Sequence, residues 1–132
     1  MEQLIIKKTK YTPQIELNAQ NGLLCLSGKS YPENSFEFYA PVIEWIENYF
    51  NNYSQFKTTI NFQIVYINGD SSKLFFDIFD LVDELVNKDK YVEINWLYDE
   101  NNERAKEVGK IFKDDFQNLS FNLKKDSANN SI

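Results

Sequence analysis

The stretch that decides the fold spans residues 58–72 and reads TTINFQIVYINGDSS. Its first ten residues alternate apolar and polar side chains, which is typical of a strand with one buried face. The apolar residues that this alternation places on the buried side are Ile60, Phe62, Ile64 and Tyr66. The run ends at NGDSS, a dense cluster of turn and helix-capping residues. A strand that leads directly into a helix is typical of the α/β class.

Downstream of this stretch, helix and strand patterns alternate. A helix is predicted from about Ser71 to Asn87, followed by a strand over Tyr91–Tyr98, a helix over about Glu103 to Phe116 and a last strand over Phe121–Leu123. The first of these helices carries two neighbouring apolar sets. The set expected to face the sheet is Leu74, Ile78, Leu81 and Leu85, and the set beside it is Phe75, Phe79, Val82 and Val86.

Upstream, the pattern predicts strands first and one helix after them. Leu4–Lys8 is a weak strand candidate, and Gln14–Leu17 with Leu23–Ser27 predicts a hairpin. Ser35 is a candidate cap for an opening turn, and Pro41 fits near the start of the regular helix that follows. The order is therefore β-β-β-α-β-α-β-α-β. It predicts a single small α/β domain over residues 1–123, with a mixed sheet and about three helices, and a flexible polar tail over residues 124–132.

Composition excludes several classes of function. The 132 residues include no His and one Cys, and the net charge is −6. Without His the commonest general base and metal ligand is missing, so we expect neither an enzyme nor a metal or cofactor site. The acidic balance argues against nucleic-acid binding. No apolar run reaches the length of a signal or membrane segment, and the lone Cys25 indicates a reducing compartment, so we expect a cytoplasmic protein away from membranes.

The sharpest local feature is the turn over residues 68–73, which reads NGDSSK. One interpretation is structural: Asp70 or Ser71 caps the helix that follows. The other is regulatory: a phosphate on Ser71 or Ser72 would lie at the positive end of the helix dipole and alter the adjacent docking surface. The two are compatible. A phosphate-binding loop is excluded, because Gly69 is the only glycine in the turn and no Gly-Lys-Ser/Thr follows.

Two further groups of side chains are open to interpretation. The helix carboxylates form a solvated face rather than a metal or acid–base site, and they are Asp77, Asp80, Asp83 and Glu84. Aromatic residues gather around the loop at residues 32–34, and they are Tyr31, Phe36, Phe38, Tyr39 and Trp45. The aromatic group either packs the loop onto the core or forms a recognition surface.

The blocks at residues 30–39, SYPENSFEFY, and 41–46, PVIEWI, resemble the signature of the SiaC family of bacterial regulatory phosphoproteins. Collinear similarity extends over about residues 9–123 and includes Tyr66-Ile67-Asn68, Ser71 and Lys73, and Asn102-Glu103-Arg104. The motif loop of this resemblance comprises Tyr31, Pro32, Glu33, Asn34 and Ser35. The resemblance implies a fold like the STAS domain of anti-sigma-factor antagonists.

The resemblance also implies a partner switch. A Ser/Thr kinase would phosphorylate the loop before the second helix, a PP2C-type phosphatase would reverse this, and the unphosphorylated form would activate a diguanylate cyclase. The family's usual run is Asn-Thr-Ser-Ser-x-Lys, with the threonine as acceptor. Here Gly69 stands at the threonine and Asp70 at the next serine. Either the acceptor has moved to Ser71 or Ser72, or Asp70 supplies a fixed negative charge.

We therefore expect a non-enzymatic signalling protein that binds its partners through the turn and the second helix. The residues expected to form that partner-binding site are Asn68, Gly69, Asp70, Lys73, Phe75 and Phe79. The alternative is a small domain that binds an anionic ligand at the helix N-terminus over residues 69–73.

Overall fold

The computed structural model describes residues 1–86 and 89–126. These residues form one sheet and three α-helices, which confirms the predicted single small α/β domain. The strands are β1 (Leu4–Ile6), β2 (Gln14–Asn18), β3 (Leu23–Ser30), β4 (Lys57–Ile67), β5 (Tyr91–Tyr98) and β6 (Ser120–Lys125). The helices are α1 (Ser35–Asn48), which continues into the π-helical turn η1 (Tyr49–Tyr53), then α2 (Gly69–Leu85) and α3 (Glu103–Asp115).

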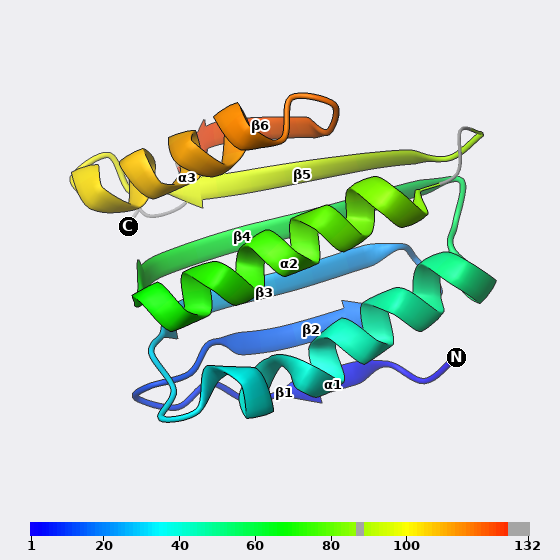
Figure 1. Cartoon of the computed structure of the whole chain (residues 1–132), viewed down its shortest axis with the longest axis horizontal. Helices are drawn as coiled ribbons and strands as arrows, with labels where there is room; N and C mark the ends of the chain where they lie inside the picture. Colours follow the sequence, from blue (N-terminus) through cyan, green and yellow to red (C-terminus); the bar gives the residue numbers. More distant parts are fainter. Residues whose placement is uncertain (87–88, 127–132) are drawn as a thin grey trace.

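The six strands lie in the sheet in their chain order. β1, β2 and β3 pair antiparallel, whereas β3, β4, β5 and β6 pair parallel. Each parallel connection carries one helix and steps to the next strand in the same direction. Because such crossovers are right-handed, all three helices lie on the same face of the sheet, as Figure 1 shows.

The core lies between this face and the helices, and it is rich in aromatic side chains. Phe62 and Trp96 project from β4 and β5 and stack with ring centroids 5.8 Å apart. Phe75 and Phe79 of α2 and Phe112 of α3 pack onto this pair, and all five side chains are fully or almost fully buried. One cluster of contacts therefore joins the central strands to two of the three helices.

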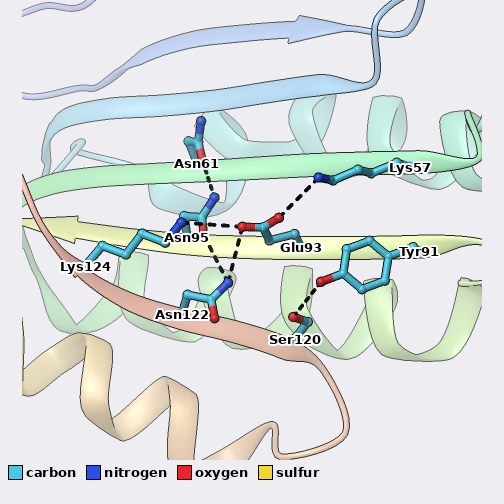
Figure 2. A network of polar contacts seen from close by, with 8 residues as sticks. All are labelled: Lys57, Asn61, Tyr91, Glu93, Asn95, Ser120, Asn122 and Lys124. Carbon is cyan, nitrogen blue, oxygen red and sulfur yellow. Dashed lines mark hydrogen bonds and ion pairs between the residues drawn. The ribbon is translucent and has the colours of Figure 1, made fainter.

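None of the helices in residues 1–86 and 89–126 covers the opposite face of the sheet, which is polar (Figure 2). Asn95 donates to the Asn61 Oδ1 atom at 2.9 Å, and Asn122 donates to the Asn95 Oδ1 atom at 3.1 Å, so an amide ladder crosses three parallel strands. Glu93 lies 3.6 Å from Lys57 and 3.5 Å from Lys124. Desolvation opposes the charge of Glu93, but the two lysines outweigh it and hold the pKa of this carboxyl below its ordinary value. These contacts let a parallel sheet expose one face to water.

A β-bulge near the end of β4 changes one prediction. Gly28 pairs with Ile64 and Lys29 with Tyr66, so Val65 is an extra residue in the ladder. Gly28 has a φ of 118°, a conformation that favours glycine. The bulge shifts the alternation by one residue, so Tyr66 is exposed instead of buried beside Ile64 as its spacing predicts. Bulges of this kind often redirect a side chain at a functional edge.

The predicted hairpin and the β5 strand are confirmed, whereas several helix ends differ. α1 begins at Ser35, because the Asn34 side chain accepts a hydrogen bond from the Glu37 N–H and caps the helix. The prediction that Ser35 caps the helix is therefore wrong. Pro41 lies within α1, six residues after its first residue, and not near its start.

The second helix and the last strand also differ from their predicted bounds. α2 begins at Gly69 and ends at Leu85, and the predicted end at Asn87 lies outside the described residues. The apolar residues of α2 that are buried are Phe75, Ile78, Phe79 and Val82, so three members of the second predicted set face the core together with one member of the first. β6 reaches Lys125, because Lys124 and Lys125 pair with β5, so the predicted tail does not begin at residue 124. Residues 127–132 of that tail lie outside the described residues.

Candidate functional site

The turn between β4 and α2 lies at the carboxyl end of the parallel strands, the edge where α/β proteins commonly bind ligands. Asn68 is the N-cap of α2: its Oδ1 atom accepts from the Ser71 N–H at 2.9 Å, and its carbonyl accepts from the Ser72 N–H at 3.0 Å. The prediction that Asp70 or Ser71 caps this helix is therefore wrong. The Asn68 side chain thus satisfies one of the N–H groups at the helix start that an anionic ligand could otherwise contact, that of Ser71.

A buried cluster of hydroxyl groups lies directly beneath this turn. Ser30 of β3 donates to the Ser71 Oγ atom at 2.9 Å, and Ser35 lies 3.2 Å from the same atom. The Tyr39 hydroxyl lies 2.5 Å from the Ser30 Oγ atom. Burial raises the pKa of Tyr39, and its hydrogen bond with Ser30 offsets this only in part. The cluster joins the end of β3 to the first turns of α1 and α2, so it fixes these two helix starts relative to each other.

The motif loop at residues 31–34 connects β3 to α1 beside this cluster. Tyr31 packs edge-on against Tyr11 and Tyr66, with ring centroids 5.3 and 5.5 Å away. The backbone of the loop is held from both sides, because the Tyr31 N–H donates to the Tyr11 carbonyl and the Asn68 N–H donates to the Ser30 carbonyl. The motif loop and the turn before α2, far apart in the sequence, are therefore neighbours in the fold.

The predicted acceptor serines lie in different environments. Ser71 is fully buried and hydrogen-bonded in the hydroxyl cluster, whereas Ser72 is partly exposed. Gly69, Asp70 and Lys73 are exposed on the first turns of α2, so the turn itself presents a surface.

Two residues of the predicted partner-binding site do not reach that surface. Phe75 and Phe79 have no exposed area, because they point from α2 into the aromatic core. The prediction that they contact a partner directly is corrected: they support the helix from below.

Sequence reasoning missed the supporting role of Ser30 and Tyr39. Both belong to the quoted motif, but nothing in the sequence indicates that Tyr39 meets Ser30, or that Ser30 meets a serine 41 residues further along the chain. The one feature of the sequence that could have indicated this role is Ser30 itself, because it is a small polar residue where a strand ends. Tyr11 was also missed, because it joins the site only through the fold.

Replacing Asn68 with alanine is expected to lower the free energy of unfolding by about 1 kcal/mol, the usual cost of losing an N-cap side chain. The loss arises because the Ser71 N–H would lose its acceptor at the start of α2. Urea denaturation measured by circular dichroism checks this. The matched control is Asn101→Ala in an exposed loop, where we expect a change within about 0.5 kcal/mol. Equal stability of the two variants would contradict the capping role.

Other kinds of site find no support in the described ranges. Within residues 1–86 and 89–126, no group of three or more His, Cys, Asp and Glu side chains is arranged to hold a metal ion. The same ranges contain no helix with the length and apolar character needed to cross a membrane. Cys25 lies on the polar face of the sheet, where partial burial raises the pKa of its thiol. A raised pKa disfavours the reactive thiolate.

The fold and the site together define a class: a small α/β regulatory domain whose polar residues converge on the start of a helix. Residues 6–126 match the family described as SiaC family regulatory phosphoprotein. The chain belongs to this family.

Relatives of known sequence and structure agree with this assignment. An uncharacterized protein of Pseudomonas aeruginosa strain UCBPP-PA14 is 36% identical over 115 residues, which cover 87% of this chain and 90% of that protein. The crystal structure of apo-SiaC from Pseudomonas aeruginosa superposes with a TM-score of 0.81 at 32% identity and covers 95% of this chain and 98% of that one. A chain in the crystal structure of the diguanylate cyclase SiaD in complex with its activator SiaC matches with a TM-score of 0.84 at 33% identity, covering 92% and 98% of the two chains.

Proposed function

We propose that this chain is a non-enzymatic cytoplasmic signalling protein that binds and activates a diguanylate cyclase, and so controls cyclic di-GMP and biofilm formation. The observation that carries the proposal is the similarity, over almost the whole chain, to the complex of SiaD with its activator SiaC. The exposed turn at Gly69 and Asp70 and the adjoining motif loop support it, because they offer a partner a continuous surface at one edge of the sheet.

The proposal is tested by adding the purified chain to the diguanylate cyclase of its source organism and measuring cyclic di-GMP formation. We expect the rate to rise with the concentration of the chain until a complex of fixed stoichiometry is saturated. Heat-denatured chain is the control. An unchanged rate, together with no complex by size-exclusion chromatography, would overturn the proposal.

We further propose that a Ser/Thr kinase and a PP2C-type phosphatase control this binding through Ser72. Burial favours Ser72 over Ser71: a phosphate on Ser71 would have to displace Ser30 and Ser35 from a closed hydroxyl cluster. Ser72 is partly exposed in the first turn of α2, where the helix dipole favours a negative group. A phosphate there adds a charge of about −1.5 to −2 beside the exposed Asp70.

Incubation with ATP and the cognate kinase is expected to add one phosphoryl group to the wild-type chain and to Ser71→Ala, but none to Ser72→Ala. Intact-mass spectrometry checks this, and Ser71→Ala is the matched control because it removes the neighbouring hydroxyl. Phosphate on Ser72→Ala would show that the acceptor lies elsewhere. A wild-type chain left unmodified by a kinase that is active on its own substrate would favour Asp70 as a fixed charge.

The same observations weaken the anionic-ligand alternative. The Asn68 side chain already accepts from the Ser71 N–H, and the Asp70 carboxylate lies in the first turn of α2. An anion that binds at the start of α2 needs hydrogen-bond donors there, but the Asp70 carboxylate would repel it. A thermal-shift screen with nucleotides is expected to give no stabilisation.

A further inference from the structure

An apolar groove lies beside the motif loop, between the β1–β2 connection and the start of α1. Its volume is about 710 Å³, and the lining residues that matter here are Lys7, Tyr11, Tyr31, Pro32, Glu33 and Phe38. The groove is therefore built mainly from aromatic and other apolar surface, with one charged residue of each sign.

A row of three tyrosines, Tyr11, Tyr31 and Tyr66, extends this groove toward the turn before α2. Neighbouring rings in the row pack edge-on, and Tyr11 and Tyr66 at its ends are 51% and 44% exposed. Tyr66 reaches the surface only because the bulge at Val65 turns it out of the core. Ordered, partly exposed aromatic side chains of this kind act as anchors in protein interfaces, since little side-chain entropy remains to be lost.

Positive charge occurs in the segments that border the groove, although the chain as a whole carries a net charge of −6. Lys7 lines the groove itself, whereas Lys8 lines a separate hollow with Gln63 and Leu97. Lys7, Lys8 and Lys10 lie in the connection from β1 to β2, Lys29 lies near the end of β3, and all four are exposed. Within residues 1–86 and 89–126, none of the four forms an ion pair. Their charges are therefore available to a partner.

The exposed carboxylates of the helical layer are most numerous on α1 and α2. α1 and α2 together carry eight exposed Asp and Glu residues against one Lys, and the carboxylates are Glu37, Glu44, Glu47, Asp70, Asp77, Asp80, Asp83 and Glu84. A partner with negative charge would thus be repelled by α1 and α2 and attracted by the lysines beside the groove, whereas α3 carries exposed charges of both signs.

We propose that the groove and the tyrosine row dock an acidic segment of the effector protein, with an apolar side chain of that segment inserted between Tyr31 and Phe38. This inference rests on the proposed function, and it names the surface and the chemistry of the partner. A nucleic acid or an anionic membrane fits less well, because either would present an extended negative surface to a chain whose net charge is −6.

The docking surface is joined to the chain segment that leads to Ser72, the proposed phosphorylation site. Tyr66 precedes the N-cap Asn68 by two residues, and the Asn68 N–H donates to the carbonyl of Ser30, the residue next to Tyr31. A phosphate on Ser72 would add negative charge to the start of α2, the helix that follows Tyr66 and Asn68, and so weaken the attraction for an acidic segment.

The test measures the affinity of the wild-type chain and its variants for the source organism's diguanylate cyclase by isothermal titration calorimetry. Lys7→Glu/Lys10→Glu is expected to weaken binding by at least about tenfold and to reduce its dependence on salt. Tyr66→Ala is expected to weaken binding by a similar factor, as loss of an aromatic anchor does. Circular dichroism confirms that each variant is folded.

Two matched controls lie away from the groove. Lys106→Glu/Lys110→Glu on α3 makes the same change of charge, and Phe56→Ala removes an aromatic side chain that is 73% exposed at the other end of β4. Both are expected to bind as the wild type does.

The outcomes separate the two proposals. If the wild-type chain binds the cyclase but the groove variants bind equally well, or the controls lose as much affinity, the groove is not the docking surface. If the wild-type chain binds no cyclase, the proposed function falls and the inference falls with it. If Lys7→Glu/Lys10→Glu weakens binding only to phosphatidylglycerol vesicles or single-stranded oligonucleotides, the occupant is not an acidic protein segment.

Discussion

Replacing Phe75 with alanine is expected to lower the free energy of unfolding by about 3 to 5 kcal/mol. Phe75 has no exposed area, and its ring lies 5.4 Å from that of Phe62, 5.5 Å from that of Tyr39 and 6.4 Å from that of Trp96. It therefore joins α1, α2 and two central strands at one point. Alanine would leave a cavity that these three neighbours, each held by further contacts, cannot fill.

The measurement is urea denaturation followed by circular dichroism. Phe36→Ala is the matched control, because Phe36 is the same residue type but is 75% exposed on α1, and we expect it to change stability by no more than about 0.5 kcal/mol. A typical domain is stable by about 5 to 15 kcal/mol, so Phe75→Ala should remain folded only marginally. A loss below about 1 kcal/mol would mean that the core rearranges around the missing ring.

The prediction at Phe75 also shows where sequence reasoning failed. Two apolar sets run along α2, and a helical pattern alone does not say which one faces the sheet. Leu74, Ile78, Leu81 and Leu85 were expected to do so, but Phe75, Phe79 and Val82 are buried with Ile78. Which set is buried depends on how α2 is rotated about its axis. That rotation is set by packing against the large rings of β4 and β5, which are distant from the α2 residues in the sequence.

Predictions from the sequence were more accurate where the local residue pattern alone defines an element. The β5 strand appears at its predicted bounds, because its alternation is regular and polar loops flank it. The junction between β4 and α2 was located to within two residues, because the helix predicted from about Ser71 begins at Gly69. Its capping residue was not identified: Asn68, Asp70 and Ser71 are all competent caps, and the choice depends on where β4 ends.

The two segments of the candidate site could be predicted from the sequence, but the contact between them could not. These segments, the motif loop and the turn before α2, were both identified, the loop through the family resemblance. Their connection depends on contacts over long sequence distances, from Ser30 to Ser71 and from Tyr31 to Tyr66. The exposure of Tyr66 was missed as well, because a bulge inverts the alternation that predicts burial.

Replacing Gly109 with valine is expected to lower the free energy of unfolding by about 3 kcal/mol. Gly109 is buried in α3, where helix propensity alone would favour almost any other residue except proline. A Cβ atom there would overlap the indole ring of Trp96 and lie 2.7 Å from the Leu123 Cδ1 atom. The indole cannot move away freely, because Trp96 is fully buried and its Nε1–H donates to the Ala105 carbonyl at 2.9 Å.

Lys110→Val is the control for this prediction, because it places the same β-branched residue on the solvent side of α3 at the next position. It carries the cost of valine in a helix, less than about 1 kcal/mol, without the overlap. Urea denaturation of both variants separates the two effects. If Gly109→Val were as stable as Lys110→Val, α3 would have to slide over β5 and β6 at little cost. The bond from Trp96 to Ala105 and the bond from the Asn102 side chain to the Val65 carbonyl argue against such sliding, since both tie the first turn of α3 to the sheet.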